Sequence, residues 1–178
     1  EDSYKNRTGF PYSREDSYGE LPDSSMVVMD YQGRIVAMVG GTGKKTENRS
    51  YNRATDSRAK RQPGSSIKPI SVYSLALDQN IISYSSLLKD TPTQTIVNSK
   101  GKKVKWPYNA GGSCTNGMVT MARALEKSYN TIPVQLIEKM GIENVYNHAV
   151  NNMGLKNLVG SEAAADKVGD LTYSSLGL

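Results

Sequence analysis

One Ser-x-x-Lys pair in the sequence stands where a loop gives way to a helical pattern. Ser65 and Lys68 follow the turn-forming residues Pro63 and Gly64 and open an amphipathic segment that continues to about Asp78. Residues three apart on a helix are neighbours, so the Lys68 amine can reach the Ser65 hydroxyl. A serine hydroxyl attacks well when a base takes its proton, and lysine is such a base when burial lowers its pKa. Ser65 is therefore a candidate nucleophile and Lys68 its candidate base.

The spacing of Ser65 and Lys68 does not by itself distinguish them, because Ser-x-x-Lys pairs recur in the chain. The other pairs lie in basic polar runs or behind a serine-rich loop, and they are Ser57/Lys60, Ser86/Lys89 and Ser99/Lys102. Only the pair at Ser65 follows a Pro-Gly turn and begins a long amphipathic segment. The simpler alternative is that Ser65 caps the helix, a role that serine commonly fills.

A second polar pair, Ser128 and Asn130, stands between two helical patterns. The first pattern runs from Val119 to Lys127, and the second starts at Pro133 and is ended by Gly141. A hydroxyl and an amide presented from a rigid corner suit proton relay and the orientation of an amide substrate. The alternative is a corner between helices that is capped by Ser and Asn.

The charge of the chain indicates what kinds of partner it can meet. It has 178 residues and a formal net charge of +5, with 37% hydrophobic residues, which predicts a soluble globular domain. No segment approaches the roughly 20 apolar residues of a membrane-spanning helix. Basic runs such as Lys100 to Lys105 suggest an anionic polymer as partner. Because the tyrosines are scattered and no nucleic-acid motif is present, a solvated surface is the better interpretation, and nucleic acid is not predicted as a partner.

The single cysteine, Cys114, and the single histidine, His148, exclude several kinds of site. One cysteine forms neither an intrachain disulfide framework nor a multi-cysteine metal site. One histidine rules out a His-rich metal site and makes a Ser-His catalytic pair a poor prospect. His148 lies on a helical stretch, Ile142 to Asn152, where a surface or capping role is expected. No metal and no cofactor is predicted.

The remaining pattern predicts an α/β fold of the α+β type. Residues 1–24 are polar and indicate a linker or extension, and residues 25–178 form the domain. Met26 to Met29 and Ile35 to Val39 form a β-hairpin whose apolar residues on both faces indicate a covered antiparallel sheet. Thr95 to Trp106 are expected as an exposed strand or loop. Helices flank the sheet and form an additional all-helical part.

Five segments of the sequence, in this order and spacing, resemble the transpeptidase domain of class A penicillin-binding proteins. They are SSMVVMDYQGRIVAMVGG, YNRAT, RQPGSSIKP, KWPYN and ALEKSYNTIPVQLIEKMG. The similarity runs from about Ser25 to Gly154, and the joint appearance of five segments is more specific than any one motif. The resemblance implies the transpeptidase fold that penicillin-binding proteins share with serine β-lactamases, incomplete in this chain.

The resemblance also implies an activity and roles for the residues that match the family's motifs. Ser65 would attack the D-alanyl-D-alanine end of a peptidoglycan stem peptide, with Lys68 as acylation base and the Ser65 N–H as one oxyanion donor. Ser128 would relay a proton to the departing amine, and Asn130 would bind the substrate amide and position Lys68. Trp106 would line the cleft. β-Lactam antibiotics would mimic the substrate and leave a stable acyl-enzyme on Ser65.

One motif of the family is missing from these 178 residues. It is Lys-Thr-Gly or Lys-Ser-Gly on a core strand, and in the family it binds the substrate carboxylate and places the second oxyanion donor. We therefore expect a second polypeptide to carry that strand. The family also implies an upstream glycosyltransferase domain and membrane anchor, and a location on the extracytoplasmic face of the bacterial cell membrane.

Two alternatives to the transpeptidase remain from the sequence. One is a β-lactamase or β-lactam sensor of the same superfamily, which shares Ser-x-x-Lys and Ser-x-Asn. The other is a non-enzymatic module that binds an anionic wall polymer through the basic surface, for which the Ser65 hydroxyl would be dispensable.

Overall fold

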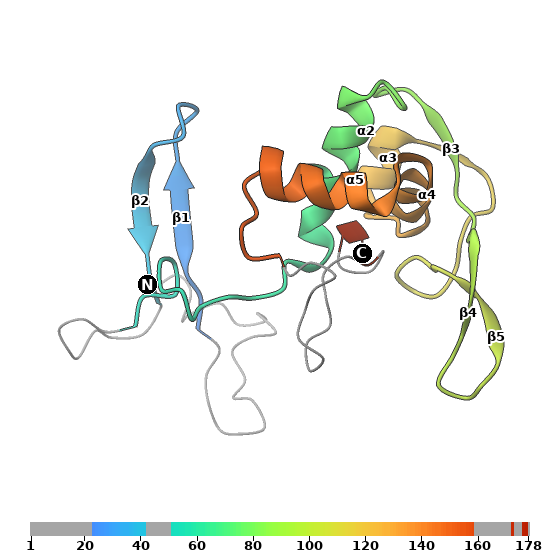
Figure 1. Cartoon of the computed structure of the whole chain (residues 1–178), viewed down its shortest axis with the longest axis horizontal. Coiled ribbons are helices and arrows are strands. Elements are labelled where there is room, and N and C mark those ends of the chain that lie inside the picture. The colour runs from blue at the N-terminus through green and yellow to red at the C-terminus, as the bar shows by residue number, and fades with distance from the viewer. Residues whose placement is uncertain (1–22, 42–50, 159–171, 173–175, 178) are drawn as a thin grey trace, which may run out of the picture. The chain divides into compact units, whose positions relative to one another are not determined.

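The computed structural model describes residues 23–41, 51–158, 172 and 176–177. The chain divides into two compact units, residues 1–62 and residues 63–178. The first unit contains a β-hairpin and the loop that follows it, and the second contains every described helix (Figure 1). The linker predicted for residues 1–24 lies outside the described residues except for its last two positions.

The predicted hairpin is present with the predicted strand limits. Strand β1 (Met26–Met29) pairs antiparallel with β2 (Ile35–Val39), and Asp30 organises the turn between them because its carboxylate accepts the Arg34 backbone N–H at 2.9 Å. Gly33 supplies the left-handed φ of +79° that this turn needs. All residues of both strands are exposed, so the described residues of the first unit do not provide the cover that was expected on the two faces.

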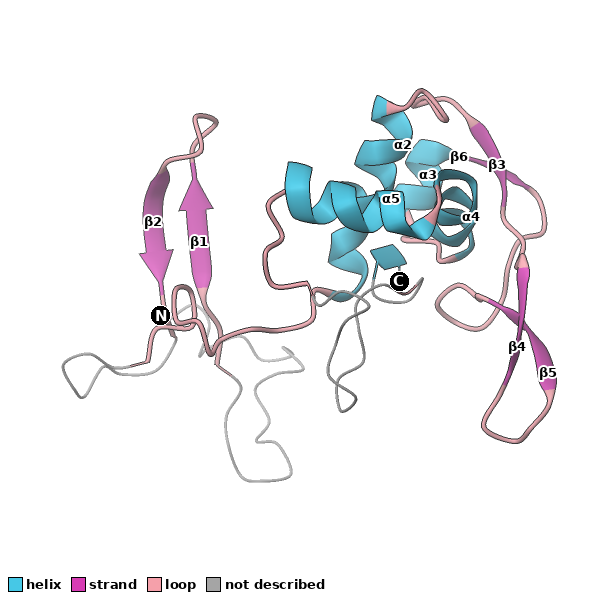
Figure 2. Cartoon of the chain, in the orientation of Figure 1, coloured by secondary structure: helices cyan, strands magenta, loops and turns pink. Residues whose placement is uncertain are grey.

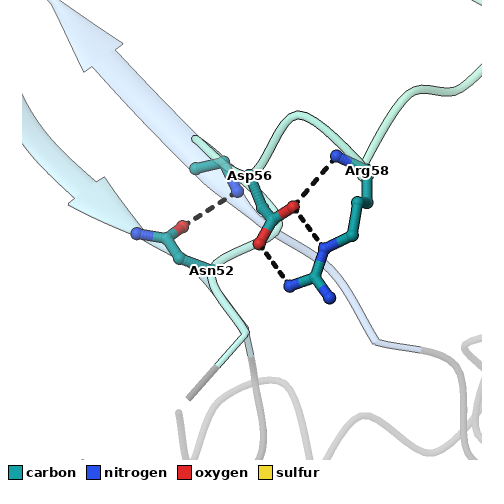
Figure 3. A network of polar contacts seen from close by, with 4 residues as sticks. Asn52, Asp56 and Arg58 are labelled. Carbon is teal, nitrogen blue, oxygen red and sulfur yellow. Dashed lines mark hydrogen bonds and ion pairs between the residues drawn. The ribbon is translucent and has the colours of Figure 1, made fainter. Parts of the chain in front are cut away.

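The loop after the hairpin is held by side chains of its own (Figure 3). The Asn52 side-chain oxygen accepts the Ala54 N–H at 2.9 Å. The Asp56 carboxylate accepts bonds from the guanidinium and the backbone N–H of Arg58, and these bonds lower the pKa of Asp56 to about 2. The loop therefore has local order that does not depend on contact with the second unit.

The segment that carries Ser65 and Lys68 is helical, as predicted, but it changes geometry twice. A 3₁₀ turn (Gly64–Ile67) leads into a π-helical turn (Pro69–Tyr73) and then into α2 (Ser74–Asp78). Pro69 has no N–H to donate within a regular helix, and the irregular geometry surrounds it. Gly64 opens the segment with a φ of +56°, which favours glycine at that position.

Two further strand pairs lie in the second unit (Figure 2). Strand β3 (Leu87–Lys89) pairs antiparallel with β6 (Met118–Thr120), and β4 (Gln94–Val97) pairs with β5 (Lys103–Trp106). The second pair confirms the strand expected between Thr95 and Trp106. The assignment of Val119 to a helix was wrong, because Val119 lies in β6 opposite Leu88.

The other helices follow closely along the chain. They are α3 (Met121–Glu126), α4 (Thr131–Met140) and α5 (Ile142–Asn147), which continues into a π-helical turn (His148–Asn152). Helix α4 begins two residues before the predicted start at Pro133, and Gly141 ends it as predicted. His148 is buried, and its Nε2 lies 2.9 Å from Ser74 Oγ, so the expected surface or capping role was wrong.

The hydrophobic core lies among these helices, with Leu176 at its edge. Helices α2 to α5 gather around it (Figure 1), and its fully buried members include Val72, Ala76, Ala124, Ile132, Leu136, Ile137 and Val145. The carbonyl of Leu176, itself fully buried, accepts a hydrogen bond of 2.6 Å from Ser71 Oγ. The chain therefore returns at residue 176 to the helical segment that begins at Ser65.

Candidate active site

The side chain of Lys68 lies at the centre of a cluster of polar groups that also includes Ser128 and Asn130. It is 1% exposed, and every hydrogen bond of its Nζ to a described residue goes to an oxygen atom of the corner between α3 and α4. The closest are Asn130 Oδ1 at 2.7 Å and the Ser128 carbonyl at 2.8 Å, followed by Ser128 Oγ at 3.2 Å and the Tyr129 carbonyl at 3.3 Å. An ammonium has three N–H donors, so these four acceptors satisfy it completely.

Burial sets the protonation chemistry of this amine. Removal from water disfavours the charged form and lowers the pKa of Lys68 to about 8. A lysine with that pKa is neutral in about a tenth of molecules at pH 7, and a neutral amine accepts a proton. The site thus has the property that a lysine base requires.

The backbone at Ser128 turns the corner oxygens toward Lys68. Helix α3 ends in a Schellman motif, in which the Ser128 N–H donates to Leu125 O and the Tyr129 N–H donates to Ala124 O. The residue at the left-handed position of this motif is usually glycine, and here Ser128 adopts a φ of +52°. This conformation costs on the order of 1 kcal/mol for a residue with a side chain. In return it directs both the hydroxyl and the carbonyl of Ser128 at one amine.

Asn130 occupies the N-cap position of α4, but its side chain does not cap the helix as the simpler alternative supposed. Its side chain makes no capping bond to α4; instead its Oδ1 accepts from Lys68 and its Nδ2 donates to the Tyr108 carbonyl at 2.7 Å. The capping role falls to Asn109, whose Oδ1 accepts the Asn130 backbone N–H at 2.8 Å. The amide of Asn130 is thereby left to hold Lys68.

Ser65 differs from its neighbour Ser66 in how its hydroxyl is used. Ser66 Oγ donates to the Pro63 carbonyl at 2.6 Å, whereas the Ser65 hydroxyl is exposed and makes no hydrogen bond to any described residue. Nor does Ser65 cap the helix, because Pro63 occupies that position without a side-chain bond. The Lys68 backbone N–H donates to Ser65 O, which places the two residues one turn apart. Ser65 thus has an exposed hydroxyl and lies three residues before the lysine whose amine is buried.

A buried acid supports the corner, and the sequence analysis did not identify it. Asp90 follows β3 and is fully buried; its Oδ1 accepts from Thr131 Oγ1 at 2.6 Å and from Asn109 Nδ2 at 2.8 Å. Its Oδ2 accepts the Thr115 N–H at 2.7 Å. Burial by itself would raise the pKa of Asp90, but these hydrogen bonds outweigh it and lower the pKa, so the carboxylate stays charged.

Two features of the sequence could have drawn attention to Asp90 and its partner Asn109. No acidic residue occurs between Asp90 and Glu126, so Asp90 is the single negative side chain of a long basic stretch. Asn109 lies in the segment KWPYN, which supplied the resemblance but was valued only for Trp106. Trp106 itself is half-buried at the end of β5, two residues before the carbonyl that holds Asn130.

The described residues contain no group of three or more His, Cys, Asp and Glu side chains placed to hold a metal ion. None of the helices within the described ranges has both the length and the apolar character to cross a membrane.

Comparison with known sequences identifies the family. A model of the penicillin-binding protein transpeptidase domain matches residues 24–177. The chain is 34% identical over 177 residues to penicillin-binding protein 1A of Clostridium acetobutylicum, which covers 96% of this chain and 22% of that protein. It is 36% identical over 126 residues to penicillin-binding protein 1A of Pseudomonas aeruginosa, which covers 70% of this chain and 14% of that protein. The chain belongs to the penicillin-binding protein transpeptidase family, as its resemblance had indicated.

A solved structure agrees with this assignment. The 2.6 Å crystal structure of penicillin-binding protein 1A from Haemophilus influenzae superposes with a TM-score of 0.56 at 29% sequence identity, over 75% of this chain and 20% of that one. The predicted α/β fold with antiparallel strands and helices is therefore confirmed. The chain spans less than a quarter of the length of these relatives.

Proposed function

We propose that this chain provides the nucleophile, base and proton relay of a peptidoglycan D,D-transpeptidase. Its substrate is a stem peptide ending in D-Ala-D-Ala, and β-lactam antibiotics acylate the same serine. The observation that carries the proposal is the contact of the buried Lys68 amine with Ser128 and Asn130, one helical turn after the unengaged hydroxyl of Ser65. Membership in the transpeptidase family supports it independently.

In the first half of the reaction the enzyme is acylated. Neutral Lys68 takes the hydroxyl proton of Ser65 while Oγ forms a bond to the carbonyl carbon of the penultimate D-alanine. The Ser65 backbone N–H donates to the oxyanion that develops. Lys68 then returns a proton through the Ser128 hydroxyl, 3.2 Å away, to the nitrogen of the terminal D-alanine, and the C–N bond breaks. Free D-alanine leaves, and the peptide stays as an ester on Ser65.

In the second half an amine of a neighbouring stem peptide attacks the ester. It loses a proton through the same groups, the new amide bond forms, and the Ser65 hydroxyl regains its proton. Asn130 binds the substrate amide, and Trp106 lines the cleft beside it. No redox partner or cofactor is needed, because every step transfers an acyl group or a proton.

The mutational test uses a fluorescent penicillin and the native full-length protein. Wild type is expected to gain one drug mass on the peptide that contains Ser65. Ser65→Ala is expected to lose the adduct, because it removes the hydroxyl oxygen that forms the acyl bond. Ser66→Ala is the matched control, since that adjacent hydroxyl is already bonded to Pro63 O, and it should keep the adduct. An adduct that persists in Ser65→Ala would contradict the assignment.

The same mass measurement tests the expected second polypeptide and the alternative functions. Mapping every polypeptide in the sample shows whether a separate chain carries the Lys-Thr-Gly or Lys-Ser-Gly strand. A β-lactamase would release the drug quickly, whereas a transpeptidase retains it.

A wall-polymer binding module would bind its polymer equally well after Ser65→Ala, and salt would weaken that binding steeply. We place the protein on the extracytoplasmic face of the membrane, with a glycosyltransferase domain and anchor upstream.

A further inference from the structure

We propose that Asp90 and Asn109 are positioning residues for acylation, because together they hold the Ser128–Asn130 corner against Lys68. Neither residue was assigned a role by its motif or by the proposed mechanism, on which this inference rests. Both are buried, and neither contacts the Lys68 amine directly. Their influence passes through hydrogen bonds to the backbone that carries the corner.

Three hydrogen bonds connect the buried carboxylate to the buried amine by way of Asn109 and Asn130. Asp90 Oδ1 accepts from Asn109 Nδ2 at 2.8 Å, Asn109 Oδ1 accepts the Asn130 N–H at 2.8 Å, and Asn130 Oδ1 accepts from Lys68 Nζ at 2.7 Å. Two amides thus separate a negative and a positive side chain, each of which is at most 1% exposed. Each amide has its oxygen toward the positive end and its NH₂ toward the negative end or a neutral carbonyl.

The same acid also fixes the first turn of α4. Thr131 Oγ1 donates to Asp90 Oδ1, and the Thr131 N–H points at Asn109 Oδ1 at 3.4 Å, a long contact. The residue after Asn130 is therefore held from two sides by the same pair. A corner that positions a proton relay has to be fixed this closely, because a displacement of about 1 Å can cost on the order of a hundredfold in rate.

The donors around Asp90 favour a charged carboxylate. Both of its oxygens accept, Oδ1 from Asn109 and Thr131 and Oδ2 from the Thr115 N–H. Asp90→Asn would turn its new NH₂ group either toward the Thr115 N–H or toward the Asn109 NH₂, so donor faces donor in either orientation. Asn109→Asp would instead place two carboxylates in contact. Each single change should therefore displace the corner.

Exchange of the two side chains restores the pairing. In Asp90→Asn/Asn109→Asp the introduced amide donates to the introduced carboxylate, its oxygen accepts the Thr115 N–H, and the Thr131 hydroxyl can turn to accept. The new carboxylate at position 109 still accepts the Asn130 N–H. The double variant keeps one negative charge and the same shape, so it should recover what the single variants lose.

The experiment measures the limiting rate constant of Ser65 acylation by a fluorescent penicillin, per folded molecule and well below each variant's melting temperature. Each single variant is expected to acylate about tenfold or more slowly than wild type, and the double variant to return to within about threefold of it. A purely structural role would change the amount of folded protein and leave this rate constant intact. Asn98→Asp is the matched control, because Asn98 Oδ1 accepts two backbone N–H groups in the β4–β5 turn, away from the site.

Three results would overturn the inference: single variants that acylate at the wild-type rate, a double variant no faster than the slower single, or an equal loss in Asn98→Asp. If a single variant does not fold, Asn109→Ser decides, because it removes the bond to Asn130 N–H without adding charge, and a wild-type rate there refutes the role. Wild-type protein that forms no adduct on Ser65 would refute the proposed function and this inference together. Normal labelling with unaffected variants would refute only this inference.

Discussion

At the scale of single residues, the site depends on a lysine that is both buried and hydrogen-bonded. Burial lowers the pKa of Lys68 to about 8, which makes the neutral amine accessible. The four oxygens around Nζ meanwhile keep the side chain in one place. Lys68 therefore remains positioned to act as a base without a further charged partner beside it.

The pH dependence of acylation follows from this pKa. In the proposed mechanism only neutral Lys68 takes the Ser65 proton, so the second-order rate constant for penicillin should rise about tenfold per pH unit below pH 8 and level off above it. Stopped-flow acylation from pH 5.5 to 9.5 measures this profile. Lys68→Arg should abolish acylation, because a guanidinium remains protonated throughout this range. A rate that is flat between pH 6 and 8 would argue against Lys68 as the base.

The sequence was sufficient to select candidate residues where they are local in the chain. Lys68 lies three residues after Ser65, and Asn130 lies two after Ser128, so motif and context selected both pairs. The structure brings Lys68 into contact with Ser128 and Asn130, and their catalytic roles stay a prediction. The sequence was not sufficient for Asp90 and its partners, because their hydrogen bonds join residues 19 and 41 positions apart. Nothing in local spacing brings such distant groups together.

At the scale of elements, short segments decide how the site is built. The hairpin was predictable to the residue because apolar runs flank an evident turn. The three residues of β6, in contrast, fit a helical pattern equally well, and only their pairing with β3 makes them a strand. The junction between β6 and α3 is therefore fixed by two things that a pattern of apolar residues does not show: strand pairing and a cap.

The cap of α3 gives a prediction for this element. Thr120 Oγ1 accepts the Arg123 N–H at 3.1 Å, and Thr120→Ala should lower the free energy of unfolding of the domain by about 1 kcal/mol. Chemical denaturation of the native protein measures the change. Thr120→Ser keeps the acceptor and serves as the control. Equal stability of the alanine variant and wild type would mean that strand pairing alone fixes the junction.

At the scale of the whole molecule, the two units differ in how much of their apolar surface they bury. The hairpin of the first unit exposes every residue of β1 and β2, while the helices of the second unit enclose a core. A two-stranded hairpin with apolar residues on both faces is marginal in water by itself. The covered sheet expected from sequence therefore needs cover from outside the described residues of its own unit.

The return of the chain at residues 176–177 makes a prediction for the second unit. A Cβ at Gly177 would lie 2.7 Å from Ile137 Cδ1 and 3.3 Å from Pro133 Cβ, so in Gly177→Ala the end of the Ile137 side chain must shift and the Pro133 ring must give way slightly. Overpacking of this kind typically costs about 1–3 kcal/mol. Thermal unfolding of the native protein measures the loss. Gly117→Ala is the comparison, because a Cβ there would meet nothing nearer than Thr115 Oγ1 at 3.9 Å. An unchanged melting temperature for Gly177→Ala would show that this contact is not tight.

The left-handed backbone conformation of Ser128 limits which substitutions evolution can accept at this position. Glycine relieves the cost of that conformation, so it is the replacement that selection for stability alone would favour at this corner. The same replacement deletes the hydroxyl that faces Lys68. A protein that gains folding stability through glycine at position 128 would therefore lose the proposed proton relay. Stabilising substitutions that keep the proposed chemistry have to lie elsewhere in the fold.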